Sequence, residues 1–352
     1  MTDPAQIDVI APNFKKRLSG VTATVIRLVP LQARDIAIAT TGPELPADMP
    51  QIPLSRLPFM SRSGPSGARV WHARRNIEML AGLGLKYLLG KRLKLVFTSA
   101  SQRHHTALTK WLIRQMDAVI ATSDKTAGYL EREATVIRHG IDTDSFCPAA
   151  DKPALRRDLG LPETGPVIGC YGRIRAQKGT DVFVDAMLRV LADHPQATAI
   201  VMGRATEKHQ AFEQGLKDRA AAAGLSGRLL FLPEVPVWEM ARWYQALDLY
   251  IAPQRWEGFG LTPLEAMACA VPVIATRVGA FEELVAGGQT GTLIAAGDVD
   301  AMVAAANAIL DDPARLAVWS QAARRHVLDH FRIAQEAAAI TAIYRSLLAQ
   351  RG

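Results

Sequence analysis

The sequence predicts an α/β protein built from two doubly wound, Rossmann-like domains, and three observations support this prediction. The chain has 352 residues, of which 49% are hydrophobic, and this is enough for two domains with a core each. Short apolar segments alternate with longer helical patterns along the chain, as is typical of parallel sheets covered by helices. A proline-rich stretch between residues 147 and 166 interrupts the alternation and has the composition of a linker.

The expected strands are short apolar runs. They are residues 7–10, 36–39, 93–97, 118–121 and 135–138 in the first half, and residues 167–171, 199–202, 229–232, 249–252, 273–275 and 291–294 in the second. We place the boundary in the linker, so that residues 1–150 form the N-terminal domain and residues 151–332 the C-terminal domain. A final helix over about residues 333–352 follows the second domain and is free to pack back on the first.

The three cysteines, Cys147, Cys170 and Cys269, are far apart and form no C-x-x-C pair. This spacing argues against a disulfide framework and against a zinc site, and it fits a reducing compartment. The first residues lack the basic and apolar segments of a signal peptide, and no apolar run approaches the length of a membrane span. We therefore expect a cytoplasmic protein.

The net charge of +7 is concentrated in the first half of the chain. Residues 1–150 contain 20 Lys and Arg against 12 Asp and Glu, whereas residues 151–352 contain 21 against 22. Between Arg56 and Arg114, twelve basic residues accompany a single acid, Glu78. A block of charge this one-sided indicates a polyanionic partner.

Residues 70–92, within this basic block, mix apolar side chains with a basic fringe. We interpret the segment as helical, with two alternatives for its role. It lies in the headgroup region of an anionic membrane, or it packs Leu80, Leu83 and Leu88 into the core and leaves the charges to solvent. Periodicity alone supports both equally.

Glu257 and Glu265 bracket the sequence Gly-Phe-Gly-Leu-Thr-Pro-Leu. Proline is tolerated in the first turn of a helix, so Pro263 predicts a helix start near Leu261 or Thr262. The glycines then lie just ahead of a helix N-terminus, where backbone N–H groups can bind an anion such as phosphate. The pair suggests a site for a nucleotide sugar, and the alternative is a capping carboxylate with an unrelated surface glutamate.

A second candidate site follows the expected strand 167–171. The loop from Gly172 to Gly179 carries Arg173 and Lys178, and doubly wound sheets bind ligands at this carboxyl end of their strands. The two cations would neutralise a diphosphate, although basic loops of this kind are often only solvated. The Walker and dinucleotide-binding glycine patterns are both absent from the sequence.

Together these motifs resemble the C-terminal half of the family-four retaining glycosyltransferases of GT-B fold. The resemblance rests on the loop with Arg173 and Lys178 and on the two glutamates, and further landmarks follow the family's order at residues 136–142, 270–275 and 279–283. Residues 13–21 resemble the family's glycine loop, with a single Gly20 where many members carry two glycines. The resemblance covers nearly the whole chain and implies two Rossmann-like domains facing an interdomain cleft.

The resemblance also implies roles for individual residues. Arg173 and Lys178 would stabilise the charge on the departing diphosphate, and Gly20 would let the backbone approach the phosphates. Glu257 would bind hydroxyls of the transferred sugar, and Glu265 would bind those of the nucleotide ribose. The remaining donor-binding positions implied by the motif are Gly258, Phe259, Gly260 and Leu261. Retention of the anomeric configuration, and no cofactor beyond the nucleotide sugar, follow from the same resemblance.

Four stretches, residues 11–14, 69–75, 97–103 and 255–265, resemble the lipopolysaccharide core mannosyltransferases of alphaproteobacteria. This closer resemblance implies GDP-mannose as the donor and a Kdo-bearing lipid A core intermediate as the acceptor. Such an acceptor is anionic and linked to a membrane, and a basic N-terminal half suits it. We therefore expect an enzyme peripherally associated with the cytoplasmic face of the inner membrane, with no nucleic-acid partner.

Many members of the resembled family carry a histidine near the anomeric centre, after the fourth strand of the first domain. The register places Ala100 at that position, and His104 and His105 follow one turn later. Imidazole titrates near neutral pH, so both histidines are candidates for acid–base chemistry. The alternative is a surface pair at a helix start.

The sequence contains two Asp-x-Asp triplets, Asp142 with Asp144 and Asp298 with Asp300, a pattern that holds a metal ion in other glycosyltransferases. Neither triplet follows a strand at the donor site, and Asp298 suits a helix N-cap, so we expect no metal. Three alternatives for the function stay open. They are transfer from a UDP-sugar to another glycolipid or polysaccharide, epimerisation of a nucleotide sugar on the same fold, and non-catalytic binding of a membrane or nucleic acid.

Overall fold

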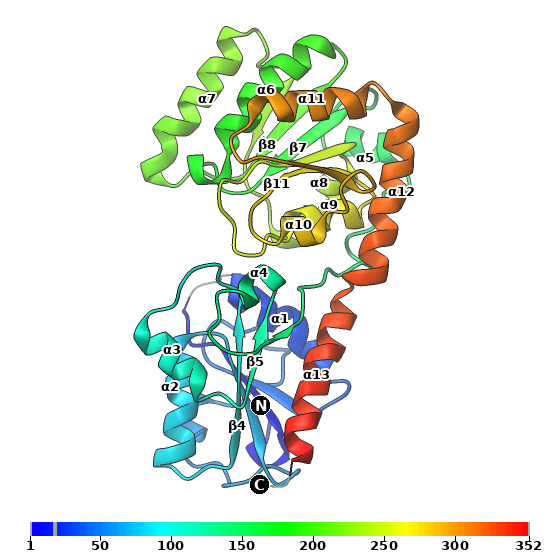
Figure 1. Ribbon diagram of the computed structural model, residues 1–352. Coiled ribbons are helices and arrows are strands. Elements are labelled where there is room, and N and C mark those ends of the chain that lie inside the picture. Colours follow the sequence, from blue (N-terminus) through cyan, green and yellow to red (C-terminus); the bar gives the residue numbers. More distant parts are fainter. Residues whose placement is uncertain (1, 17–19, 351–352) are drawn as a thin grey trace. The chain divides into compact units, whose positions relative to one another are not determined.

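The computed structural model describes residues 2–16 and 20–350 of the chain. The chain forms two compact units, one of residues 1–140 with 333–352 and the other of residues 141–332. Each unit contains a six-stranded sheet with helices on both faces (Figure 1), and this confirms the predicted α/β class. Among the described residues, no helix combines the length and the apolar character needed to cross a membrane.

The sheet of the first unit is parallel, with the strand order β2-β1-β3-β4-β5-β6. Its strands are β1 (Val9–Pro12), β2 (Ile38–Thr41), β3 (Arg69–Ala73), β4 (Leu93–Ser99), β5 (Ala118–Ala121) and β6 (Thr135–Val136). Its helices are α1 (Gly20–Gln32), α2 (Asn76–Leu83), α3 (Ala107–Arg114), α4 (Asp124–Ala127) and α13 (Ile333–Ala349), with the short turns η1 (Pro4–Gln6), η2 (Leu54–Arg56) and the π-helical turn η3 (Gly84–Leu88). Helices α1 and α13 share one hydrophobic cluster with the sheet, and α2 and α3 share the other.

The structure corrects the predicted helix over residues 70–92. Its first residues belong to β3, which lies between β1 and β4, and α2 begins only at Asn76. Arg69 and His72 are fully buried in this strand. The Arg69 guanidinium donates to the carbonyl oxygens of Ile7 and Pro4, and His72 Nε2 lies 2.6 Å from the Thr98 hydroxyl. A buried parallel strand typically has an unbroken apolar run, and these two polar residues interrupt that run in β3. The sequence therefore did not predict this strand.

The sheet of the second unit is also parallel, with the order β12-β11-β10-β7-β8-β9. Its strands are β7 (Val167–Tyr171), β8 (Thr198–Met202), β9 (Leu229–Leu232), β10 (Leu249–Ala252), β11 (Val273–Thr276) and β12 (Gly291–Ile294), each within one residue of its prediction. Its helices are α5 (Lys152–Asp158), α6 (Thr180–Asp193), α7 (Gln210–Ala222), α8 (Met240–Gln245), α9 (Thr262–Ala268), α10 (Phe281–Leu284), α11 (Val299–Leu310) and α12 (Pro313–His330), with the turns η4 (Ala176–Lys178), η5 (Glu207–His209) and η6 (Val237–Glu239).

Strand β10 shows why the strands of the second unit could be predicted from the sequence. Leu249 and Ile251 pack into the cluster that contains α6 and α11, whereas Tyr250 and Ala252 pack into the cluster that contains α8 and α9. All four side chains are fully buried. A strand covered on both faces needs an unbroken apolar run, and the sequence provides one.

In both sheets the order of the strands reverses at one point. In the first unit the reversal lies between β1 and β3, and in the second it lies between β7 and β10. The loops that leave two such neighbouring strands diverge to opposite faces, so a crevice forms at the carboxyl ends, where α/β proteins bind ligands. This topology determines which loops of each unit can form a site.

Candidate active site

The two candidate loops of the second unit start at its switch point. The loop over residues 172–179 follows β7, and the loop over residues 253–261 follows β10. They touch where Gly179 has φ +70° and a Cβ atom would lie 1.8 Å from the carbonyl oxygen of Pro253. Only glycine permits both this backbone conformation and this approach.

Arg255 braces the same two loops. Its backbone N–H donates to the carbonyl oxygen of Gln177 at 3.0 Å, and its guanidinium donates to both carboxylate oxygens of Asp181 at 2.7 and 2.8 Å. Burial alone would raise the pKa of Asp181, but the hydrogen bonds from Arg255 hold that pKa below its usual value. A bidentate pair of this kind fixes the loops in orientation as well as in distance.

Within this frame, Lys178 and Glu257 form an ion pair between Nζ and Oε2. Their side chains are 23% and 18% exposed, so the pair is largely enclosed and still open to a ligand. The second oxygen of Glu257, Oε1, accepts a hydrogen bond from the backbone N–H of Gly258 at 3.0 Å. The two residues predicted to contact the diphosphate and the sugar are therefore brought together.

The turn after Glu257 is tightly packed around its glycines. Gly260 has φ +87°, and a Cβ atom there would lie 2.3 Å from the Phe281 ring and 2.8 Å from Cγ of Glu257. The Phe259 side chain is buried in the core, and its carbonyl oxygen accepts from the backbone N–H of Ala280 at 3.2 Å. The ring of Phe259 is therefore not available to a ligand.

The predicted helix start is confirmed, since α9 begins at Thr262 with Pro263 in its first turn. Leu261 occupies the N-cap position, and no side chain caps this end. Arg173, in the other loop, is exposed, and its guanidinium has no hydrogen-bond or ion-pair partner among the residues that the structure describes. An exposed cation without a partner, in the same loop as Lys178, suits an incoming polyphosphate.

Glu265, in the first turn of α9, accepts a hydrogen bond from the Tyr244 hydroxyl at 2.8 Å. Tyr244 is fully buried, and burial together with the neighbouring Glu265 charge raises the pKa of its phenol well above the usual value. The phenol therefore remains protonated and donates to the carboxylate. Tyr244 lies in a buried group of rings, 5.0 Å from Tyr171 and 5.3 Å from Tyr250 between ring centroids, which fixes its orientation.

We expect Tyr244→Phe to weaken binding of the nucleotide sugar more than it slows turnover, because the substitution removes a hydrogen bond that orients the carboxylate predicted to hold the ribose. Hydrogen bonds to charged groups contribute about 1.5–3 kcal/mol, so the affinity for the donor should fall by about tenfold or more. Titration calorimetry with the nucleoside diphosphate measures this change. An unchanged affinity, in a variant that unfolds at the wild-type temperature, would contradict the positioning role of Tyr244.

Three further predicted site residues belong to the first unit. Gly20 begins α1 and is exposed, and a Cβ atom there would meet nothing within 4 Å, so packing does not require glycine. His104 is exposed, with its ring 5.3 Å from that of Tyr129. His105 is half-buried, and burial, followed by the nearby cations Arg103 and Lys110, lowers its pKa. The catalytic roles of both histidines stay predictions.

The residues of both Asp-x-Asp triplets have structural partners. Asp142 Oδ2 accepts from the hydroxyl of Ser145 at 2.6 Å, and its Oδ1 accepts from the backbone N–H of Asp144 at 3.1 Å. Asp298 caps α11 by accepting from the backbone N–H of Ala301 at 2.9 Å, which confirms the predicted N-cap. These carboxylates order their own loops.

Sequence reasoning missed several residues that hold the site. Arg255 and Tyr244 carry no motif of their own, although a basic residue two positions before Glu257 could have drawn attention. At the switch point of the first unit, Arg75 donates to Asn13 at 2.9 Å and pairs with the fully buried Glu78 at 2.6 Å. The sequence shows Arg75 only as one cation among many.

The profile of the family described as "Glycosyl transferases group 1" matches residues 151–326 of this chain. The lipopolysaccharide core biosynthesis mannosyltransferase LpsB of Rhizobium meliloti (strain 1021) is 54% identical over 353 residues, which cover 99% of this chain and 100% of LpsB. The mannosyltransferase LpcC of Rhizobium leguminosarum bv. viciae, described in the same words, is 50% identical, with 99% of each chain covered.

Two solved structures extend this comparison. The crystal structure of Anabaena HepE in complex with UDP has a TM-score of 0.83 at 21% identity, over 97% of this chain and 100% of HepE. The C-terminal domain of a glycosyl transferase group 1 protein (LpcC) from Francisella tularensis has a TM-score of 0.53 at 32% identity, over 55% of this chain and 100% of that domain. The predicted GT-B architecture and the resemblance to lipopolysaccharide core mannosyltransferases are both confirmed. This chain belongs to the glycosyl transferases group 1 family.

Proposed function

We propose that the protein transfers mannose from GDP-mannose to a Kdo-containing lipopolysaccharide core acceptor, with retention of the anomeric configuration and without a metal ion. Two relatives that match it over their full length are named lipopolysaccharide core mannosyltransferases, which supports the sugar and the pathway. The ion pair of Lys178 and Glu257 at the switch point carries the chemical part of the proposal. It sets a cation for a diphosphate directly beside a carboxylate for sugar hydroxyls.

In the proposed reaction, the bond between the anomeric carbon and the diphosphate oxygen breaks, and its electron pair stays on the diphosphate. Lys178 and Arg173 stabilise that charge as it develops. The acceptor hydroxyl then bonds to the anomeric carbon from the face that the diphosphate leaves, and its proton departs with the diphosphate. Glu257 holds the sugar by its hydroxyls and stabilises positive charge near the ring, so no side chain has to bond covalently to the sugar.

Binding of the nucleotide is proposed at the same two loops, with Glu265 on the ribose and the backbone of residues 258–261 close to the sugar or the phosphates. The name of the HepE structure records UDP, so the shared fold is compatible with a nucleoside diphosphate. Arg173 and Lys178 provide the charge that a divalent cation supplies in other enzymes, which supports metal-independent transfer.

The anionic membrane surface is the proposed second partner, and the first unit is the part that meets it. Three of its twelve basic residues between Arg56 and Arg114 are not available, since Arg69 and Arg74 are buried and Arg75 pairs with Glu78. The other nine remain at or near the surface. Large apolar side chains are also exposed on α2, on η3 and the residue after it, and on α3, namely Ile77, Leu80, Tyr87, Leu88, Leu89, Leu108 and Trp111. Leu83, by contrast, is buried in the core.

A panel of nucleotide sugars tests the proposed reaction against a Kdo–lipid A acceptor, with product linkage and anomeric configuration determined by NMR. We expect transfer from GDP-mannose, an α-linked product from the α-linked donor, and activity that survives a chelator. Transfer from UDP-glucose but not from GDP-mannose would overturn the donor assignment. Epimerised donor without product would favour the epimerase alternative, and activity lost to a chelator and restored by magnesium would refute metal independence.

A further inference from the structure

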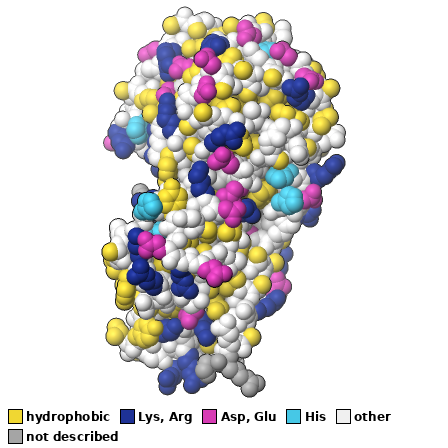
Figure 2. Space-filling model, viewed as in Figure 1, with side chains coloured by type: hydrophobic (Ala, Val, Ile, Leu, Met, Phe, Trp, Pro, Cys, Tyr) yellow, Lys and Arg dark blue, Asp and Glu magenta, His cyan; other side chains and the backbone are white. Residues whose placement is uncertain are grey.

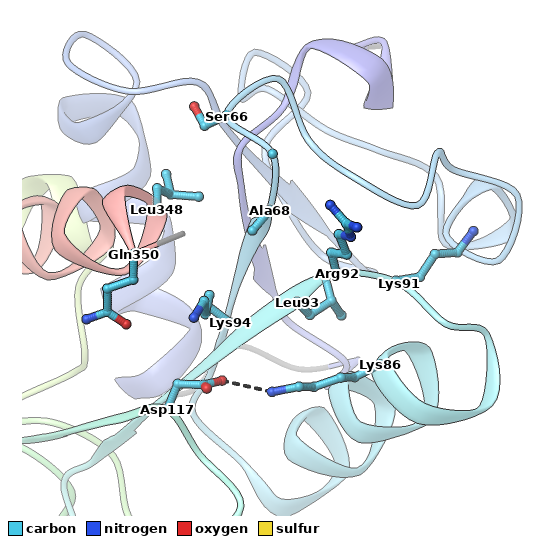
Figure 3. Close-up of a pocket in the computed structure, with 11 residues that line it drawn as sticks. Ser66, Ala68, Lys86, Lys91, Arg92, Leu93, Lys94, Asp117, Leu348 and Gln350 are labelled. Carbon is cyan, nitrogen blue, oxygen red and sulfur yellow. Dashed lines mark hydrogen bonds and ion pairs between the residues drawn. The ribbon is translucent and has the colours of Figure 1, made fainter. Parts of the chain in front are cut away.

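The first unit contains a pocket of about 580 Å³ at the amino-terminal ends of β3 and β4 (Figure 3). The pocket lies at the amino-terminal ends of the strands. Gly20 and the histidine pair follow the opposite, carboxyl-terminal ends. The volume is in the range of sites for small ligands. Four cations and one acid line the pocket, namely Lys86, Lys91, Arg92, Lys94 and Asp117, so its charged side chains sum to +3.

The cations of this pocket are only partly compensated. Lys86 Nζ lies 3.1 Å from Asp117 Oδ2, which also accepts from the backbone N–H of Leu95 at 2.6 Å. Lys91 Nζ donates to the carbonyl oxygen of Met60. The side chains of Arg92 and Lys94 have no hydrogen-bond or ion-pair partner within residues 2–16 and 20–350. Two cations without partners, beside two that have them, leave positive charge that a phosphate group could neutralise.

Exposed apolar side chains adjoin the pocket. Tyr87, Leu88 and Leu89 are 64%, 85% and 48% exposed, and they lie in the chain between Lys86 and Lys91. Phe59, 88% exposed, belongs to a neighbouring loop. The backbone N–H of Arg92 donates to the carbonyl oxygen of Arg62 at 2.8 Å, and with the bond from Lys91 to Met60 it holds that loop against the segment. Figure 2 shows apolar and basic side chains side by side at the lower end of this unit.

A soluble anion would use the cations and leave the apolar side chains without a role. A nucleic acid would match the charge and could stack on the exposed rings of Tyr87 and Phe59, but it would leave the exposed Leu88 and Leu89 without a role. Basic residues beside protruding leucine and aromatic side chains are typical of surfaces that enter the headgroup region of a bilayer. The combination favours an anionic phospholipid bilayer as the occupant.

We propose that this pocket binds the phosphate of an anionic phospholipid headgroup, while Leu88, Tyr87 and Phe59 enter the boundary between headgroups and acyl chains. The site deepens the membrane contact proposed above and rests on that part of the proposed function. The pocket is distinct from the acceptor loop at Gly20, because it lies at the amino-terminal ends of the strands and Gly20 lies beyond the carboxyl-terminal end of β1. The lipid bound here anchors the enzyme and is not consumed.

The test measures binding of the full chain to phosphatidylcholine vesicles with and without phosphatidylglycerol. The double variant Arg92→Glu, Lys94→Glu should bind the anionic vesicles at least about 30-fold more weakly, as expected for two lost basic contacts. Its matched control is Arg34→Glu, Lys208→Glu, which changes the net charge equally at two exposed residues outside the pocket. A second variant, Leu88→Ser with Phe59→Ser, keeps all charges and should bind at least about tenfold more weakly.

Three outcomes would overturn the proposal. They are equal vesicle binding by the pocket variant and its control, binding of inorganic phosphate at the pocket without binding of vesicles, and duplex DNA bound as tightly as vesicles. Affinity for GDP-mannose, measured separately by calorimetry, should be the same in all variants. If the wild-type protein bound no nucleotide sugar, the proposed reaction would be refuted, whereas the conclusion from vesicle binding would be unaffected.

Discussion

Replacing Lys178 by alanine is expected to lower turnover by about 100-fold or more, a loss of about 3 kcal/mol of transition-state stabilisation. The substitution removes the cation that lies nearest to Glu257 and is placed to meet the diphosphate. Because charge on the diphosphate grows as the sugar leaves, the loss should appear mainly in kcat and not only in KM. Steady-state release of GDP from GDP-mannose in the presence of acceptor measures both.

Lys208→Ala is the matched control for Lys178→Ala, since Lys208 is an exposed lysine of the same unit in the turn η5. It should keep wild-type kinetics. Both variants should unfold at similar temperatures, because the pair with Glu257 is partly solvated and partly exposed pairs contribute little to stability. A Lys178→Ala protein that is folded and keeps most of its turnover would remove Lys178 from the mechanism.

Glu257→Gln should lower kcat by at least about 100-fold and leave the affinity for the nucleoside diphosphate unchanged or higher. The amide preserves the shape of the side chain but removes the negative charge near the developing oxocarbenium centre. It also ends the competition for Lys178, whose ammonium is shared between Glu257 and an incoming diphosphate. Calorimetry with GDP and steady-state kinetics separate the two effects, and Glu207→Gln, at an exposed glutamate of η5, serves as control.

The combination of Lys178→Ala with Glu257→Gln shows whether the two residues act together. Neighbouring groups that share one task give losses that do not add, so the double variant should lose less than the product of the single losses. Strict additivity would mean that the ion pair is incidental to catalysis. Weaker binding of GDP by Glu257→Gln with an unchanged kcat would assign Glu257 to binding alone.

The second unit could be predicted almost completely from its sequence, because its strands are apolar on both faces and its loops carry long, specific motifs. The helix start at Thr262 follows from Pro263, and the proximity of the two candidate loops follows from strand order. The contact between Lys178 and Glu257 could not be read in the same way. That contact depends on the close approach of Gly179 to Pro253 and on the hydrogen bonds of Arg255. No regular spacing of residues in the sequence indicates either of them.

The first unit was harder to predict because polar residues lie inside it. Arg69 and His72 occupy the buried strand β3, and their partners come from the distant residues Pro4, Ile7 and Thr98. For the same reason, the number of basic residues in the sequence overstates the positive charge at the surface of this unit. Arg69, Arg74 and Arg75 add to the basic total in the sequence, yet they are bound internally and offer little to a partner.

The brace between the loops also has an entropic consequence. Arg255 and the close approach at Gly179 hold Lys178 and Glu257 in place before any ligand arrives. Ordering a long charged side chain costs up to about 2 kcal/mol, and here folding has met that cost in advance. Substitutions that break the pair of Arg255 and Asp181 should therefore lower the affinity for the donor. This effect does not require either residue to contact the donor. A ligand that meets an already ordered cation and carboxylate loses less freedom on binding.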